Sequence, residues 1–323
     1  MNDEQKSPDA SKQQWQQDVI NRLAFAALNE QKKSRRWKIF FVFLFISYLF
    51  LVYFTAFVKP DSAGAALTGK NHTALVEVNG VIADDQSASA DNIVTGLRKA
   101  FKNEKVQGVI LRINSPGGSP VQAGYVNDEI VRLREQYPNT KVYAVITDIG
   151  ASGGYYIAAA ADEIYADKAS LVGSIGVIMN SFGFTEAIDK LGVDRRLYTA
   201  GENKGFLDPF SPEKQEDVQH VKNMLTNIHQ QFIDTVKKGR GDRLADDPKL
   251  FSGLIWTGEE SLELGLIDGL GSSSYVAREV IQAENIVDYT PRPDFFERFT
   301  RQFGAAMGQA ISKTMGLEGG SIR

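Results

Sequence analysis

The chain of 323 residues contains no cysteine and only three histidines. The absence of cysteine excludes a thiolate nucleophile, a disulfide and a cysteine-ligated metal site. With so few histidines and no His-Glu-x-x-His helix, a zinc site is also disfavoured, and we expect neither a metal nor a cofactor. The net charge of −4 and the isoelectric point near 5.6 provide no electrostatic case for binding nucleic acid.

Charged residues are missing from one long stretch, the 20 residues from Ile39 to Val58. As a helix this stretch would be roughly 30 Å long, about the thickness of the hydrocarbon core of a bilayer. A buried core helix is rarely apolar on every face, and a cleaved signal peptide has a shorter apolar region nearer the N-terminus. We therefore predict a single uncleaved transmembrane anchor from Ile39 to Val58, in contact with the lipid bilayer.

Basic residues flank this stretch unequally. Lys59 alone follows it closely, whereas five basic residues precede it: Lys32, Lys33, Arg35, Arg36 and Lys38. Because basic residues are retained on the cytoplasmic side of a membrane, we predict a cytoplasmic N-terminus and an extracytoplasmic body. The predicted location is the inner (cytoplasmic) membrane, crossed once, with the body in the periplasm if the cell is Gram-negative.

The chain divides by composition into five predicted parts. They are a cytoplasmic segment (1–38), the anchor (39–58), a linker (59–72), the main domain (73–290), and a C-terminal amphipathic helix with a tail (291–323). Within the main domain, strand-like and helix-like patterns alternate, which is typical of an α/β fold with parallel strands. We expect strands over 74–81, 106–113, 142–149, 163–166 and 174–178, and helices over 91–101, 121–135 and 212–239.

Ser152 lies in the small-residue segment Gly150-Ala151-Ser152-Gly153-Gly154, directly after the apolar run 142–149. A serine at a turn from strand to helix projects its hydroxyl group, and glycines allow a substrate to approach the backbone closely. Ser152 is therefore the candidate nucleophile. The segment also matches the Gly-x-Ser-x-Gly nucleophile elbow of α/β-hydrolases, a fold that needs a histidine late in the chain.

None of the three histidines is well placed to be the base for this serine. We expect His220 and His229 to lie on a solvated face of the helix 212–239, and His72 to precede the first strand near the linker. A lysine can serve instead, provided that burial or nearby positive charge lowers its pKa by about three units from the reference value near 10.4. Lys204, between glycines and apolar residues that could enclose it, is the candidate, and Lys168 is its nearest rival.

A second glycine-rich turn, Asn114-Ser115-Pro116-Gly117-Gly118, follows the expected strand 106–113. Taken alone, this segment is an ordinary Pro-Gly turn. Consecutive glycines at a strand end also free backbone N–H groups to point at a ligand oxygen, which an acyl-transfer enzyme needs where the tetrahedral oxyanion forms. Together with the glycine-rich turn at Ser152, this second turn favours an oxyanion hole.

Four motifs along the chain occur in the order found in the signal peptide peptidase A family. The motifs are Asn114-Ser115-Pro116-Gly117-Gly118, Ala151-Ser152-Gly153-Gly154-Tyr155-Tyr156, Gly173-Ser174-Ile175-Gly176-Val177 and Gly201-x-x-Lys204. Between Thr73 and Gly271 the chain resembles the short, single-module bacterial form of this family. The resemblance implies the fold shared by Clp protease and the crotonases, with repeated β-β-α units. It also implies a serine endopeptidase that degrades remnant signal peptides after their release from preproteins.

The same resemblance implies roles for individual residues. Ser152 would be the nucleophile and Lys204 the general base of a Ser-Lys dyad, and the hydroxyl of Ser174 would orient the lysine amine. The backbone N–H groups of Gly118 and Gly153 would form the oxyanion hole. In short members of the family, serine and lysine meet across a subunit interface, so a homo-oligomeric ring such as an octamer is implied.

Three other functions stay open from the sequence. A crotonase-like acyl-CoA enzyme also uses glycine-rich turns as an oxyanion hole. Its substrate is a cytoplasmic metabolite, however, whereas the predicted body is extracytoplasmic. The other two alternatives are a protease for one specific membrane protein and an inactive membrane scaffold that keeps the fold but cleaves nothing.

Overall fold

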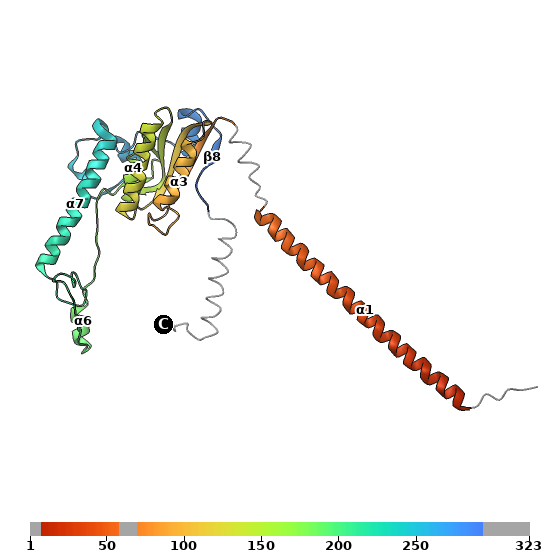
Figure 1. Cartoon of the computed structure of the whole chain (residues 1–323). Coiled ribbons are helices and arrows are strands. Elements are labelled where there is room, and N and C mark those ends of the chain that lie inside the picture. Colours follow the sequence, from red (N-terminus) through yellow and green to blue (C-terminus); the bar gives the residue numbers. More distant parts are fainter. Residues whose placement is uncertain (1–7, 58–69, 293–323) are drawn as a thin grey trace, which may run out of the picture. The chain divides into compact units, whose positions relative to one another are not determined.

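The structure is a computed structural model in which residues 8–57 and 70–292 are described (Figure 1). The chain forms two compact units, and the candidate site residues belong to the unit Ala63–Arg292, which we call the body. Most of the predicted linker, the end of the predicted anchor at Val58 and the predicted C-terminal helix lie outside the described residues.

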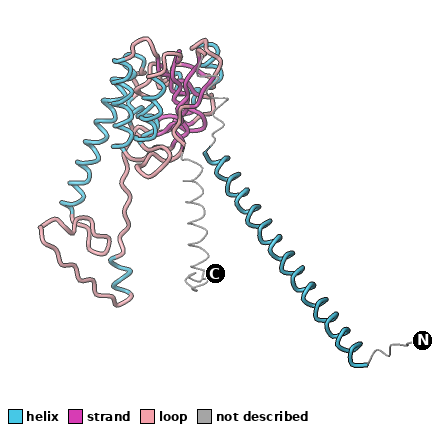
Figure 2. Tube along the Cα trace, turned by 45° about the vertical axis from the view of Figure 1, so that its right-hand side comes forward, coloured by secondary structure: helices cyan, strands magenta, loops and turns pink. Residues whose placement is uncertain are grey.

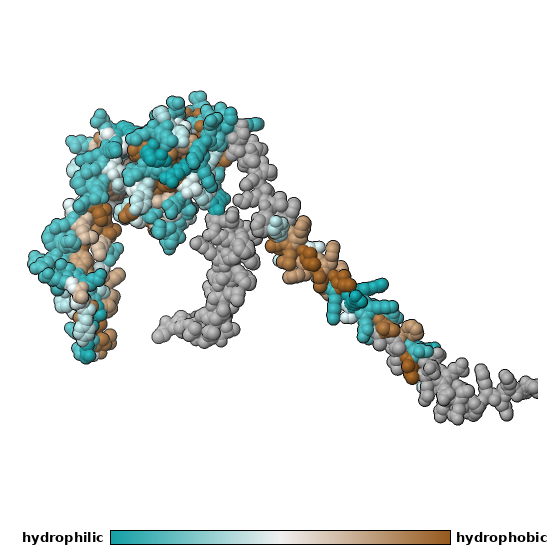
Figure 3. All heavy atoms as spheres, viewed as in Figure 1, coloured by the Kyte–Doolittle hydropathy of each residue, from teal (hydrophilic) through white to brown (hydrophobic). Residues whose placement is uncertain are grey.

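The N-terminal part of the chain is one continuous helix, α1 (Pro8–Phe57). Within it, Leu28–Tyr53 is long and apolar enough to cross a membrane, and none of its most apolar window is buried against other described residues. Figure 3 shows an apolar stretch on this helix next to a hydrophilic one, in agreement with the apolar and basic runs of the sequence. The apolar N-terminal helix is therefore present, and it is longer than the predicted anchor.

One mixed sheet of eight strands forms the centre of the body as far as the chain is described (Figure 2). The strands are β1 (His72–Asn79), β2 (Val106–Ser115), β3 (Lys141–Ala151), β4 (Glu163–Ala166), β5 (Leu171–Gly173), β6 (Ile255–Thr257), β7 (Gly269–Leu270) and β8 (Ile286–Asp288). The main path runs in the order β6-β5-β3-β2-β1-β8, and β4 and β7 extend the sheet from β3. All pairs are parallel except β5 with β6.

The body also contains seven α-helices in its described part, most of which pack on this sheet, while α6 lies away from it (Figure 1). They are α3 (Ala90–Phe101), α4 (Pro120–Gln136), α5 (Gly153–Ala158), α6 (Thr185–Lys190), α7 (Gln215–Arg240), α8 (Gly258–Glu263) and α9 (Ser273–Tyr275). Residues of α3 and α4 such as Leu97 and Ile130 join the main apolar core with the strands. A smaller core cluster lies around Tyr143 and includes Val276 of a π-helix, Val276–Val280.

The parallel register brings the two glycine-rich turns to one edge of the sheet. Ser115, at the end of β2, is paired with Gly150, near the end of β3. The turn at Gly117 and Gly118 and the turn at Ser152 therefore leave the sheet from neighbouring positions. This is the edge of a parallel sheet, beyond the carboxyl ends of the strands, where open α/β folds bind ligands.

The α/β class with largely parallel strands is confirmed, and two local expectations are wrong. The chain has no strand over 174–178, because Gly173 and Ser174 both have positive φ angles, 106° and 50°, which turn it out of the sheet after β5. His72 does not precede the first strand. It is the first residue of β1 and is fully buried, with its ring hydrogen-bonded to the hydroxyl of Tyr289 and the carbonyl of Lys70.

Residues 178–214, which we call the arm, lead away from the sheet, and α7 leads back to it (Figures 1 and 2). The arm contains α6, which has no buried residue among those described. Large apolar side chains of the arm are widely exposed, and Figure 3 shows apolar surface gathered over this part of the body: Ile178, Met179, Phe182, Leu191, Val193 and Tyr198. Exposed apolar surface of this extent is typical of an interaction site.

Candidate active site

Ser152 occupies a sharp turn between β3 and α5. Its backbone angles are φ 53° and ψ −122°, a sparsely populated region for any residue other than glycine. The turn is held because the N–H of Ser152 donates to the carbonyl of Gly173 at 2.8 Å, and its carbonyl accepts the N–H of Tyr156 at 2.9 Å. A strained serine at this kind of turn presents its hydroxyl outward, as a nucleophile requires.

The turn that follows β2 is held against the chain that follows β1. The N–H of Ile82 donates to the carbonyl of Gly117 at 2.9 Å, and the N–H of Ser119 donates to the carbonyl of Ile82 at 2.8 Å. Gly117 and Gly118 have φ angles of 100° and 151°. A Cβ atom on Gly118 would collide with the carbonyl of Ile82, so the close approach of the two segments requires glycine there.

Two backbone N–H groups that have no acceptor among the described residues lie beside Ser152. The nitrogen of Gly118 is 3.4 Å from the position that a Cβ atom would take on Gly153. Within the described part of the chain, no acceptor takes the N–H of Gly118 or that of Gly153, which begins α5. The structure thus brings the predicted nucleophile and both predicted oxyanion donors together.

Ser152, Gly118 and Gly153 line one cavity of about 160 Å³. Its other walls are largely apolar and include Tyr156 and Phe232, whose rings lie 5.0 Å apart. Phe232 comes from α7, a helix for which no role in the site is predicted from the sequence. The apolar spacing of Ile228, Phe232 and Val236 on that helix was the available signal. A cavity of this size and lining fits a small or medium apolar side chain.

The two late histidines differ from each other. His220 is exposed, with its ring edge-on to Phe206 at 5.6 Å, as expected for a solvated face. The expectation for His229 is wrong: it is half-buried, and its Nε2 lies 3.0 Å from the carbonyl of Ile175, where it supports the segment after β5. No hydrogen bond between described residues joins either ring to Ser152, so a Ser-His pair is absent from this part of the chain.

Lys204, the predicted base, and Ser174, which is predicted to orient its amine, lie apart from this cavity. Lys204 is exposed on the arm, and its backbone N–H donates to the carbonyl of Gly201 at 3.1 Å. Ser174 is half-buried, and its N–H donates to the carbonyl of Leu254 at 2.7 Å. Neither side chain is among those that line the cavity at Ser152 in the described body. Within one chain, Ser152 and Lys204 are therefore not brought together.

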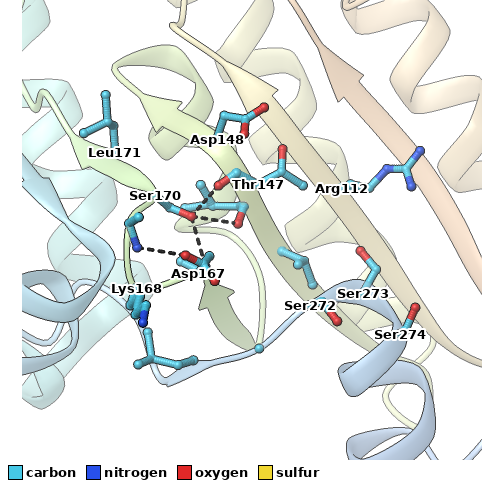
Figure 4. A pocket seen from close by; sticks show the side chains of 16 residues that line it. Arg112, Thr147, Asp148, Asp167, Lys168, Ser170, Leu171, Ser272, Ser273 and Ser274 are labelled. Atoms are coloured by element: carbon cyan, nitrogen blue, oxygen red, sulfur yellow. Dashed lines mark hydrogen bonds between the residues drawn. The ribbon is translucent and has the colours of Figure 1, made fainter.

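Lys168, the rival base, belongs to a different cavity of about 830 Å³ (Figure 4). The figure shows it beside Asp167 and Ser170, on the loop between β4 and β5. The hydroxyl of Ser170 donates to the carbonyls of Thr147 and Ile146 in the neighbouring strand. Ser152 is not among the described residues that line this cavity, so Lys168 is not positioned as its base.

A buried ion pair anchors the end of α7 that lies beyond the cavity. Arg240 is 1% exposed and donates to both carboxylate oxygens of Asp268, at 2.6 and 3.0 Å, and to the carbonyl of Gly265. Burial opposes ionisation of Asp268, but the hydrogen bonds and charge of Arg240 outweigh it and hold the pKa of Asp268 below its usual value. The pair fixes α7, and with it Phe232, against the sheet.

Comparison with known proteins agrees with this geometry. Residues 134–287 match Peptidase family S49. A protein of Synechocystis sp. assigned as a protease is 33% identical over 202 residues, which are 62% of this chain and 69% of that protein. A protein of Enterococcus faecium assigned as signal peptide peptidase SppA is 28% identical over 252 residues, 75% of this chain and 72% of that protein.

Another relative carries a different name. The Na(+)/H(+) antiporter NhaA of Brucella abortus is 53% identical over 175 residues, which are 54% of this chain and 24% of the antiporter. This chain thus spans about a quarter of the length of that relative. The family match and the Synechocystis alignment are consistent with the parallel sheet and the strained serine. The predicted Clp protease/crotonase-like fold is confirmed. This chain therefore belongs to peptidase family S49.

Proposed function

We propose that this chain is a membrane-anchored serine endopeptidase that uses a Ser-Lys dyad. The observation that carries the proposal is the strained turn of Ser152, at φ 53°, beside the N–H groups of Gly118 and Gly153, for which the described residues provide no acceptor. Membership of a peptidase family supports hydrolysis of peptide bonds by this arrangement. Backbone strain of this kind is costly and is concentrated at functional sites.

The proposed reaction begins when the hydroxyl of Ser152 attacks the carbonyl carbon of a peptide bond. A neutral lysine amine takes the hydroxyl proton and later gives it to the leaving amine. The N–H groups of Gly118 and Gly153 hold the oxyanion of the tetrahedral intermediate. Water then hydrolyses the acyl-enzyme and regenerates Ser152.

We assign the base to Lys204 of a neighbouring copy of the chain. Lys204 is exposed on the arm, and it is not part of the cavity at Ser152 in its own chain. The apolar side chains around it on the arm would be covered if a second copy packed against them. A homo-oligomeric ring such as an octamer would repeat this contact, with Ser174 orienting the lysine amine at each site.

The proposed substrates are remnant signal peptides and other apolar peptides. The cavity of about 160 Å³ at Ser152 has walls such as Tyr156 and Phe232 that suit a small or medium apolar side chain. The apolar stretch that begins at Ile39, within the candidate span Leu28–Tyr53, would anchor the chain in the inner membrane, with the body outside the cytoplasm. An anchored body would lie close to the membrane in which signal peptides are left after cleavage.

The test compares Ser152→Ala and Lys204→Ala with the unmodified full chain on a signal-peptide substrate. We expect both variants to be inactive, Lys168→Ala to remain active as the matched control, and a chelator to have no effect. Because the dyad is proposed to form between copies, mixing the two inactive variants before assembly should restore part of the activity. Full activity of either single variant would contradict the dyad.

A further inference from the structure

We propose that the hydroxyl group of Ser115 is the positioning element of the oxyanion hole. It holds the turn that presents the N–H of Gly118 to the substrate carbonyl. The inference rests on the proposed function, since it concerns the charge that forms when Ser152 attacks a peptide bond. Ser115 does not touch the reacting atoms, so its role is positioning rather than catalysis.

Ser115 ends β2, and its side chain is fully buried. The hydroxyl donates to the carbonyl of Gly80 at 2.6 Å and accepts the N–H of Gly117 at 3.1 Å. One buried group therefore ties the turn after β1 to the turn after β2. Because the hydroxyl both donates and accepts, its loss would leave a carbonyl and an N–H without their partner.

The direction of the Gly118 N–H follows from the peptide bond that it shares with Gly117. The carbonyl of Gly117 is held by the N–H of Ile82 at 2.9 Å. In a trans peptide the C=O and the N–H point to opposite sides, so the N–H of Gly118 points away from Ile82. Gly153 lies close to this N–H, since a Cβ atom on Gly153 would be 3.4 Å from the nitrogen of Gly118. The hydroxyl of Ser115 therefore holds the N–H of Gly117, and the N–H of Ile82 holds its carbonyl.

Ser115 also contacts the second turn. A Cβ atom on Gly154 would lie 2.9 Å from the carbonyl oxygen of Ser115 and 3.3 Å from its Cβ. The start of α5 therefore packs directly on Ser115, and Gly153, the other proposed donor, is the first residue of that helix. Through these contacts Ser115 sets the spacing between the two donors.

Removal of the hydroxyl should weaken catalysis more than binding. Oxyanion donors act only when they lie about 2.7–3.1 Å from the developing charge, and loss of one donor costs about 10²–10³ in kcat. A donor that is misplaced rather than removed should cost less, about 10- to 100-fold in kcat. KM should change by no more than about twofold, because the interaction is made in the transition state.

The experiment uses the full chain with Ser115→Ala and, as the matched control, Ser170→Ala. Ser170 is also a buried serine whose hydroxyl bridges backbone groups, but those groups belong to residues 146, 147 and 167 and not to either glycine-rich turn. We would measure kcat, KM and thermal unfolding, together with the affinity for a peptide aldehyde and for the product peptide. The aldehyde forms an adduct with the serine that carries an oxygen into the hole, whereas the product peptide does not.

We expect Ser115→Ala to lower kcat and the affinity for the aldehyde by similar factors, and to leave the affinity for the product peptide nearly unchanged. Ser170→Ala should keep its kcat even if it is destabilised as much. If Ser115→Ala does not fold, Ser115→Cys takes its place, because it keeps most of the side-chain volume and a weak donor. Ser115→Cys should fold and have a kcat below that of the unmodified chain. Equal losses in both alanine variants, or an unchanged kcat in Ser115→Ala or Ser115→Cys, would overturn the inference.

Ser152→Ala, measured in the same assay, separates this inference from the proposed function. If Ser152→Ala is fully active, the proposed function fails, and the role of Ser115 fails with it. If Ser152→Ala is inactive while Ser115→Ala keeps the kcat of the unmodified chain, the proposed function stands and only the role of Ser115 is overturned.

Discussion

A Cβ atom on Gly117 would lie 2.7 Å from the backbone nitrogen of Gly153. It would lie at the same distance from the Cβ of Ser152. The two glycine-rich turns are thus packed backbone against backbone, without room for a side chain between them. The pairing of Ser115 with Gly150 at the ends of β2 and β3 is what places them so close.

Gly117→Ala should therefore separate the nucleophile from the oxyanion donors. Gly117 also has a φ angle of 100°, which alanine rarely adopts. We expect kcat to fall by about 100-fold or more, since a shift of about 1 Å in the reacting groups has that effect. Initial rates on a peptide substrate provide the measurement, and an unchanged kcat would show that the turns do not form the site.

Gly124→Ala is the matched control for this variant. Gly124 lies inside α4, and a Cβ atom there would meet no atom of the described residues within 4 Å. Alanine in a helix interior is favoured over glycine by about 0.5–1 kcal/mol, so this variant should be slightly more stable. Its activity should equal that of the unmodified chain.

Phe232→Leu should change which side chain the cavity at Ser152 accepts. Phe232 is 5% exposed, packs on Tyr156 and lines the cavity, so a smaller residue at this position enlarges the cavity. We expect kcat/KM to shift in favour of substrates with a bulkier apolar side chain before the cleaved bond. The loss in the free energy of unfolding should be roughly 1–2 kcal/mol.

A panel of peptides that differ only at that position provides the measurement for Phe232→Leu. Val236→Ala, on the same helix and fully buried but not in the cavity wall, is the control, and its selectivity should not change. The same order of preference in Phe232→Leu as in the unmodified chain would remove Phe232 from the proposed subsite.

His229→Gln should retain most of the activity. The ring of His229 contacts the carbonyl of Ile175 and not Ser152, and a glutamine amide can donate to the same carbonyl. We expect kcat to fall by less than about tenfold, because His229 is not the proposed base. If it were the general base, its replacement would lower kcat by about 10²–10⁴. Measured rates near zero for His229→Gln would favour a Ser-His mechanism instead.

Asp268→Asn should destabilise the body in a pH-dependent way. The pKa of Asp268 is lowered in the folded protein, so its ionisation favours folding above the ordinary carboxyl pKa. This contribution is lost as the pH falls through the lowered value. We expect a loss of about 3 kcal/mol at neutral pH, because Arg240 would remain buried without its partner.

Urea unfolding at several pH values provides the measurement for this pair. The difference between Asp268→Asn and the unmodified chain should stay constant above about pH 5 and narrow only below about pH 4. Asp246→Asn, at an exposed position, should stay within about 0.5 kcal/mol at every pH. A difference for Asp268→Asn that is independent of pH would contradict the role of its charge.

Much of the fold could be predicted because its signals are local. The apolar runs that form β1, β2 and β3, and the pattern that predicts the helix 121–135, depend on residues that are neighbours along the chain. The expected strand over 174–178 was wrong because the positive φ angles at Gly173 and Ser174 depend on contacts with Leu254, which is distant along the chain.

In the candidate site, too, the parts with local sequence signals could be predicted, and the parts that depend on long-range packing could not. Ser152, Gly118 and Gly153 stand in short glycine-rich motifs, and the structure brings them together. The contribution of α7 was missed, because the face that a long helix turns toward a cavity depends on how the helix packs. His229 was placed on a solvated face for the same reason.

The amino-acid sequence alone predicts the alternation of strands and helices, the apolar N-terminal helix and Ser152 as the candidate nucleophile. These follow from the local order of apolar residues and glycines. The fold shows in addition that the two glycine-rich turns meet, that Phe232 closes the cavity and that Lys204 lies outside it in a single chain. The physical reason is that strand register and helix packing depend on contacts between residues that are far apart along the chain.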